Sequence, residues 1–248
     1  MDMKQGSSSR NVSLLAWINF LGCFQLYTVV AVIFFAQVTG SYALALSVFS
    51  ISTATSAILN IPLGLFSDCT SRKVTLSLGI LAELLQIFFY ATAGGFLLLA
   101  IGSIFGGLSS ALFSGNNDAF LHDTLKESAQ ADEYPAKLGK IKSLGQMAFA
   151  GAALLGSLVA ARSLNLAVAL SAIPVSIGLF LSLFLVEPKI HQDVKRQHFF
   201  IALRQSISEF ARNRELRNLS IASIIEGQLT KPLNSFRPLF TPQLSPSG

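Results

Sequence analysis

Residues 64–73 read Gly-Leu-Phe-Ser-Asp-Cys-Thr-Ser-Arg-Lys, and a long apolar run lies on each side of them. Hydrocarbon tolerates charged side chains poorly, so Asp68, Arg72 and Lys73 have to lie at a boundary with water. An apolar run of about 20 residues is long enough to cross the roughly 30 Å of hydrocarbon in a bilayer as a helix. The stretch therefore predicts a tight polar hinge between two membrane-spanning helices.

The composition of the chain supports the same interpretation. Of the 248 residues, 52% are hydrophobic and 12% are charged, whereas soluble domains carry about 25% charged residues. Strands with open edges cannot satisfy their backbone groups in lipid, so we expect an all-α membrane protein. The net charge of +5 comes from basic residues in the gaps between the apolar runs, which argues against nucleic acid as a partner.

Six spanning helices are expected, near residues 12–37, 42–66, 74–94, 96–121, 143–161 and 165–186. Basic residues collect in cytoplasmic loops, and eight of the nine Lys/Arg residues before residue 187 fall on one side of this arrangement, with Arg162 on the other. The sequence therefore predicts a multi-pass protein of the inner (plasma) membrane. Residues 1–11 form a cytoplasmic N-terminal tail in this prediction, and residues 12–186 form the six-helix bundle.

After the sixth expected helix the sequence becomes polar. Between residues 187 and 214, apolar and basic residues recur at helical spacing, which predicts a cytoplasmic connector with an amphipathic helix. That helix either lies on the inner membrane face or packs on protein. Residues 215–248 begin an apolar segment that Glu226, Lys231 and Pro232 interrupt. We therefore expect an incomplete seventh helix in a chain truncated relative to its relatives.

The hinge stretch resembles the G-x-x-x-D-x-x-G-R-K/R signature of the major facilitator superfamily, which joins the second and third helices on the cytoplasmic side. Ser71 stands where that signature has its second glycine. Residues 114–127, Ser-Gly-Asn-Asn-Asp-Ala-Phe-Leu-His-Asp-Thr-Leu-Lys-Glu, resemble a stretch after the fourth helix in one bacterial branch of the superfamily. Together the matches cover residues 14–230 and resemble the N-terminal half of such a transporter.

This resemblance implies a secondary active transporter that moves a small solute by alternating access, as a permease or in efflux. It assigns an inner-gate motif to Gly64, Asp68, Arg72 and Lys73. It also implies that the aspartate contacts a helix of the C-terminal half, so the expected partners are the lipid bilayer, the solute, and a C-terminal half or second copy. Proton-coupled drug efflux is not supported, because the fourth helix has no Arg and the fifth has no Pro.

Further polar residues are candidates for the transport path. Glu83 lies near the middle of an expected spanning helix, where an acid is costly unless it is paired, protonated or facing water. It is either an ion- or substrate-coupling site or a neutral acid bonded between helices. Asp118 and Asp123 are candidates for the same coupling role or belong to a hydrated helix end. Three polar residues either line a central cavity or form interhelical hydrogen bonds: Asn19, Gln25 and Tyr27.

Two other classes of protein are weighed against a transporter. An intramembrane serine protease is disfavoured, because Leu112 occupies the first glycine position of a G-x-S-G motif around Ser114 and all three histidines fall in cytoplasmic segments. A non-transporting membrane fragment, or a half-transporter that works only with a partner chain, stays open as the alternative. The sequence predicts no enzyme or cofactor, and two cysteines do not make a metal cluster. A disulfide between Cys23 and Cys69 is not expected, because they fall at different depths of the membrane.

Overall fold

The computed structural model describes residues 2–188, and all the regular elements in that range are helical. The elements are α1 (Asp2–Cys23), η1 (Thr28–Val30), α2 (Ala31–Thr39), α3 (Tyr42–Cys69), α4 (Arg72–Ala91), α5 (Phe96–Phe113), α6 (Asn116–Glu127), η2 (Ala131–Glu133), α7 (Tyr134–Ala160) and α8 (Leu164–Ser182). The predicted connector beyond Pro188 and the predicted incomplete seventh helix, 215–248, lie outside the described residues.

Six segments of the described chain are long and apolar enough to cross a membrane: Ser8–Thr39, Tyr42–Gly64, Arg72–Ala91, Phe96–Glu127, Ala131–Ala160 and Leu164–Ser182. Large apolar side chains point outward from them, and Ile58, Leu97 and Leu154 are each 73% exposed. Such side chains are unfavourable in water and favourable in hydrocarbon. The predicted all-α, multi-pass membrane fold with six spanning helices is confirmed.

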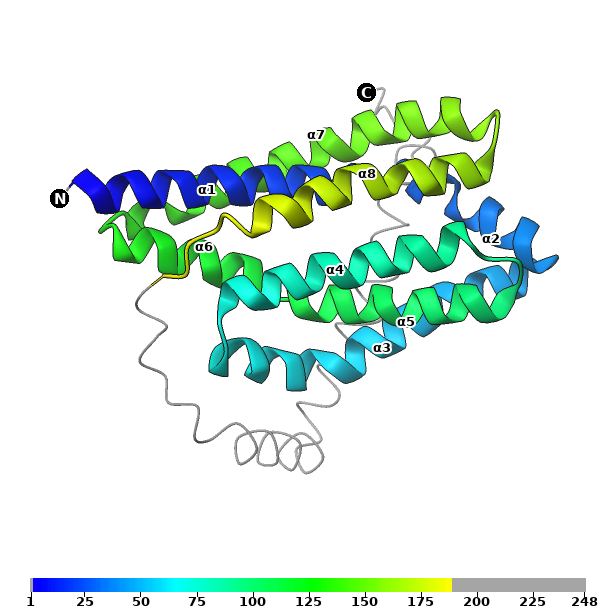
Figure 1. Ribbon diagram of the computed structural model, residues 1–248, viewed down its shortest axis with the longest axis horizontal. Helices are drawn as coiled ribbons and strands as arrows, with labels where there is room; N and C mark the ends of the chain where they lie inside the picture. The colour runs from blue at the N-terminus through cyan, green and yellow to red at the C-terminus, as the bar shows by residue number, and fades with distance from the viewer. Residues whose placement is uncertain (1, 189–248) are drawn as a thin grey trace, which may run out of the picture. The chain divides into compact units, whose positions relative to one another are not determined.

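The helices form two neighbouring groups. In Figure 1, α3, α4 and α5 lie together, and α1, α7 and α8 form the second group. Helix α4 packs against α8 and joins the two groups. Close packing depends on small residues: a side chain at Gly107 of α5 would collide with the backbone carbonyl of Ser52 in α3. The polar hinge between α3 and α4 therefore belongs to one packed bundle.

The first span is interrupted, although the sequence predicted one continuous helix over residues 12–37. Helix α1 begins at Asp2, ends at Cys23, and is followed by η1 and α2. At the interruption, the backbone N–H of Leu26 donates to the hydroxyl of Ser171 in α8, over 2.9 Å. A side chain at Gly156 of α7 would collide with the carbonyl oxygen of Leu26. The break thus has a hydrogen-bond partner on α8 and lies directly against α7, two helices that are distant in sequence.

The fourth span is also broken. Gly115 has φ 73°, a left-handed conformation that favours glycine, and it separates α5 from α6 where the sequence predicted a helix over 96–121. The new helix begins at Asn116, which is only 2% exposed. The fifth span begins at Tyr134 rather than near residue 143, with a proline in its first turn. After the break at Gly115, the start of α6 lies next to the α3–α4 hinge.

Candidate functional site

Hydrogen bonds join the hinge between α3 and α4 to α6 and to the chain that follows α8. The hinge cluster, as we call it, consists of Ser67, Ser71, Arg72, Lys73, Asn116, Asp123 and Glu187. Its members come from three stretches that are far apart in sequence, 67–73, 116–123 and the chain after α8. The cluster therefore connects the ends of several spanning helices at one end of the bundle, which we call the hinge end.

Glu187 closes the N-terminus of α4. One carboxylate oxygen accepts the backbone N–H of Arg72 over 2.8 Å, and the other accepts the N–H of Lys73 over 2.8 Å and the hydroxyl of Ser71 over 2.6 Å. The first N–H groups of a helix have no partner within the helix and carry partial positive charge. A carboxylate there stabilises the helix by about 0.3–1 kcal/mol, and by up to about 2 kcal/mol when partly buried.

Ser71 is also the N-cap residue of α4. Its hydroxyl oxygen accepts the backbone N–H of Val74 over 3.3 Å while it donates to Glu187. The signature that the hinge resembles has glycine at this position, and the structure shows what the serine does instead. The hydroxyl accepts one of the unpaired N–H groups at the start of α4. It also holds the segment after α8 against this helix end. Sequence reasoning missed Glu187, although an acid directly after the sixth helix, on the same side as the hinge, was the available signal.

Arg72 and Asp123 form a partly buried ion pair between α4 and α6. The distance from Nε to the carboxylate is 2.8 Å, and the two side chains are 13% and 14% exposed. At this exposure the pair is shielded from solvent better than a surface salt bridge, and hydrogen bonds between charged groups are short and strong. The imidazole of His122 lies 3.5 Å from the other oxygen of Asp123.

Asn116 ties the first residue of α6 to both sides of the hinge. Its amide nitrogen donates to the carbonyl of Arg72 over 3.0 Å, and its amide oxygen accepts the hydroxyl of Ser67 over 2.6 Å. The amine of Lys73 donates to the carbonyl of Leu183, just after α8. The hinge end is therefore a network in which α3, α4, α6 and the exit from α8 share donors and acceptors.

Other predicted site residues lie apart from this network. Gly64 is inside α3, and no described atom lies within 4 Å of where its side chain would begin. Asp68 is in the last turn of α3, but its side chain lies outside the described residues. Asp118 pairs with Lys142 over 3.2 Å, with side chains 42% and 57% exposed. Exposed pairs of this kind contribute about 0–1 kcal/mol.

Glu83 faces a cavity of about 200 Å³ between α1, α4, the α5–α6 break and α8. Asn19, Cys23 and Asn117 also line it. The amide of Gln25 donates to one oxygen of the Glu83 carboxylate. The amide oxygen of Asn117 is buried and has no hydrogen-bond partner in the described part of the chain. The cavity thus holds a carboxylate and an unpartnered acceptor inside the six-helix bundle.

Tyr27 has a different environment from the other two polar candidates of the first span. Its side chain is 6% exposed and packs edge-on against Tyr90, with ring centroids 5.9 Å apart. The amide of Gln86 donates to its hydroxyl over 3.5 Å. Asn19 lines the Glu83 cavity and Gln25 binds Glu83, so these two lie at a polar cavity, while Tyr27 is part of the aromatic core.

The sequence was compared with models of known protein families. Residues 12–246 match the Major Facilitator Superfamily. A comparison with curated protein sequences finds no match. Members of this family are membrane transporters, and six membrane-length helices are the content of one half of such a transporter. The chain belongs to the Major Facilitator Superfamily.

Proposed function

We propose that the chain moves a small solute across the membrane by alternating access, with its six helices acting as one of two bundles. The observation that carries this proposal is the double attachment of the α4 N-terminus, to Glu187 beyond α8 and to Asp123 in α6. In alternating access, one bundle rocks against another around a fixed site. A bundle that rocks as one body needs firm joints between its helices, and the hinge cluster supplies them.

The inner gate forms where the hinge end meets a second bundle, from a C-terminal half or a second copy. Arg72 and Lys73 are engaged inside their own bundle, with Asp123 and with the carbonyl of Leu183. Asp68 lies in the last turn of α3, where the same hinge begins. In this proposal, Arg72 and Lys73 hold the hinge in shape, and Asp68 makes the contact across the gate when the transporter is closed to the inside.

Glu83 is the coupling residue in this proposal. Asp118 and Asp123 each have a cationic partner, whereas the polar groups of the Glu83 cavity include a buried acceptor without a donor. Such a site favours an occupant that brings positive charge or protons. Ligand pockets usually measure about 300–1,000 Å³. The smaller cavity here suits a coupling ion, a proton or a small cation, rather than the solute itself.

In this proposal the chain lies in a bacterial-type inner membrane, and its hinge end faces the cytoplasm. Arg10, Lys126 and Lys137 belong to that end together with the hinge residues, and Arg162 follows α7 at the other end. Basic residues stay preferentially on the cytoplasmic side. A single cysteine introduced at Lys137 is therefore expected to be labelled by an impermeant thiol reagent only in opened cells, and one at Gly94 in intact cells.

Alternating access is tested with Cys23, which lines the Glu83 cavity. With Cys69 replaced by serine, the full chain is reconstituted in vesicles, and an impermeant methanethiosulfonate reagent is added to one side at a time. The proposal expects Cys23 to react from both sides, because each state opens the cavity to one of them. A Cys23→Ser variant provides the blank. Reaction from one side only would overturn the proposal.

A further inference from the structure

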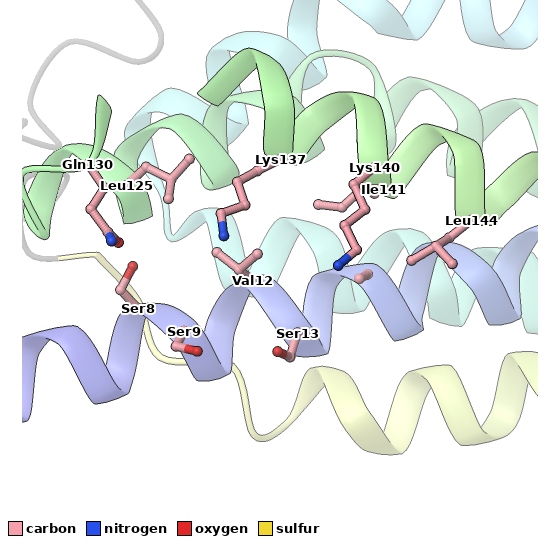
Figure 2. Close-up of a pocket in the computed structure, with 11 residues that line it drawn as sticks. Ser8, Ser9, Val12, Ser13, Leu125, Gln130, Lys137, Lys140, Ile141 and Leu144 are labelled. Atoms are coloured by element: carbon pink, nitrogen blue, oxygen red, sulfur yellow. The ribbon is translucent and has the colours of Figure 1, made fainter. Parts of the chain in front are cut away.

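A second pocket, of about 370 Å³, lies at the hinge end between α1, α7 and the turn after α6. Figure 2 shows the amines of Lys137 and Lys140 extending from α7 toward α1. Across from them, Ser8, Ser9 and Ser13 line the pocket from α1. None of the described residues that line it is acidic. The pocket therefore collects cationic and hydroxyl donors from two spanning helices.

The charge of the pocket is only partly neutralised. Lys137 lies 3.4 Å from Glu133, one turn earlier on the chain, and both side chains are nearly half exposed. Such exposed pairs are weak and leave the amine available. Lys140 has neither an ion pair nor a hydrogen bond within the described range. Two amines thus line the pocket and only one of them has a carboxylate partner, so the pocket carries net positive charge.

Two of the three serine hydroxyls that line the pocket remain available to a ligand. Ser8 is already engaged, with the hydroxyl of Ser128 at 3.0 Å and the carbonyl of Thr124 at 3.3 Å. Ser9 and Ser13 are exposed and have no hydrogen-bond partner among residues 2–188. They lie four positions apart on α1, on neighbouring turns of one helix face. Two amines and two free hydroxyls on facing helices match the several acceptor oxygens of a phosphate group.

Part of the pocket lining is apolar, with Val12 from α1 and Ile141 and Leu144 from α7. A ligand that carries both a phosphate and a hydrocarbon chain would satisfy both parts. Lysine binds phosphate as a flexible point charge, and basic pockets between spanning helices bind the headgroups of anionic lipids. We propose that this pocket binds a phosphate group, and that in the membrane the phosphate belongs to an anionic phospholipid. This inference does not rest on the transport proposal, because it concerns binding alone.

The test compares lipids on the purified full chain. The protein in detergent is incubated with equal amounts of phosphatidylglycerol and phosphatidylcholine, and retained lipid is measured by native mass spectrometry. The proposal expects preferential retention of phosphatidylglycerol. Lys140→Gln is expected to lower that retention about fivefold. Ser13→Asp, which places a carboxylate at the rim, is expected to have a similar effect, and both positions are exposed, so neither change should prevent folding.

Lys126→Gln is the matched control, because Lys126 is an exposed lysine in the last turn of α6 that does not line the pocket. Its retention of phosphatidylglycerol is expected to change by less than about twofold. Equal losses in Lys126→Gln and Lys140→Gln, or no preference over phosphatidylcholine, would overturn the proposal. Inorganic phosphate supplies the second arm. If it binds in a Lys140-dependent manner while no lipid is retained, the phosphate site stands and the lipid assignment is overturned.

Discussion

Glu187 holds the N-terminus of α4 through the backbone N–H of Arg72, 2.8 Å from its carboxylate. The two residues are 115 positions apart, and the contact joins the exit of the sixth span to the hinge before the third. Because the side chain of Arg72 also binds Asp123, one residue links α4 to two other parts of the bundle. The hinge signature in this chain is therefore a joint within its own bundle as well as a candidate gate.

Glu187→Ala is expected to lower the stability of the folded chain. The change leaves two backbone N–H groups and the hydroxyl of Ser71 without their acceptor, which should reduce stability by about 1–2 kcal/mol. Thermal unfolding in detergent measures the effect. Glu133→Ala is the control, since the Glu133 carboxylate makes only exposed contacts, a pair with Lys137 and a 3.4 Å hydrogen bond from the amide of Gln130. Equal loss in both variants would contradict the capping role.

The Arg72–Asp123 pair is expected to show strong energetic coupling. A double-mutant cycle with Arg72→Gln and Asp123→Asn should give a coupling free energy of about 1–3 kcal/mol, because the pair is partly buried. The same cycle on the exposed pair of Asp118 and Lys142 should give less than about 1 kcal/mol. Urea unfolding of the reconstituted protein provides the four stabilities of each cycle. Coupling free energies of similar size would contradict the distinction between the partly buried pair of Asp123 and the exposed pair of Asp118.

Two glycines of α7 test the break in the first span. Gly156→Ala places a methyl group against the backbone of Leu26, whereas the methyl group of Gly151→Ala meets only the ring of Phe24 at 3.6 Å. The first change is expected to destabilise the chain by about 1–3 kcal/mol, and the second should be close to neutral. Both residues lie in the same helix, so helix propensity changes equally. A Gly156→Ala protein as stable as the unmodified chain would mean that α7 and the break lie further apart than the structure shows.

Asn117→Leu is expected to stabilise the chain and to impair ion binding. Its buried amide oxygen has no partner in the described part of the chain, and such a group costs about 1–3 kcal/mol. Thermal unfolding should therefore occur at a higher temperature in the variant. A bound cation should protect Cys23 from a thiol reagent, and this protection should decrease in the variant. It is measured at constant pH, with Na⁺ replacing choline. A less stable variant that keeps this protection would argue against the assignment of the cavity.

Glu83→Gln separates charge from shape at the same cavity. The amide has the size of the carboxyl group and can still bind Gln25, so folding should be preserved. Cation protection of Cys23 is expected to disappear, because the negative charge that attracts the ion is gone. Unchanged protection in this variant would show that the cavity does not use Glu83 as its charged ligand.

Apolar blocks of about 20 residues were enough to predict the six spans, because the thickness of hydrocarbon sets their length. The two breaks were not predicted. Hydropathy does not reveal that the backbone N–H of Leu26 donates a hydrogen bond to Ser171, which lies 145 positions away. The break at Gly115 had a local signal, since glycine after serine at the end of an apolar run favours a turn, but the surrounding apolar periodicity favoured a continuous helix.

At the hinge, the sequence identified Arg72, Lys73 and Asp123 as candidate site residues, and the structure brings these three together in one network. Glu187 was not among the candidates, and the hydrogen bonds of Asn116 to the hinge were not expected. Their roles depend on how helices pack, since Asn116 acts only because α6 starts beside the hinge. Spacing along the chain can predict charges at a helix end, whereas the acceptor that meets them from another helix follows from tertiary packing.

The most direct test of the account is the ratio of Cys23 labelling rates from the two sides of the membrane. We compare the Cys69→Ser protein with the same protein carrying Glu187→Gln or Glu133→Gln. If the hinge cluster keeps the bundle moving as one body, Glu187→Gln shifts this ratio and Glu133→Gln leaves it unchanged. The same ratio in all three proteins would contradict the account.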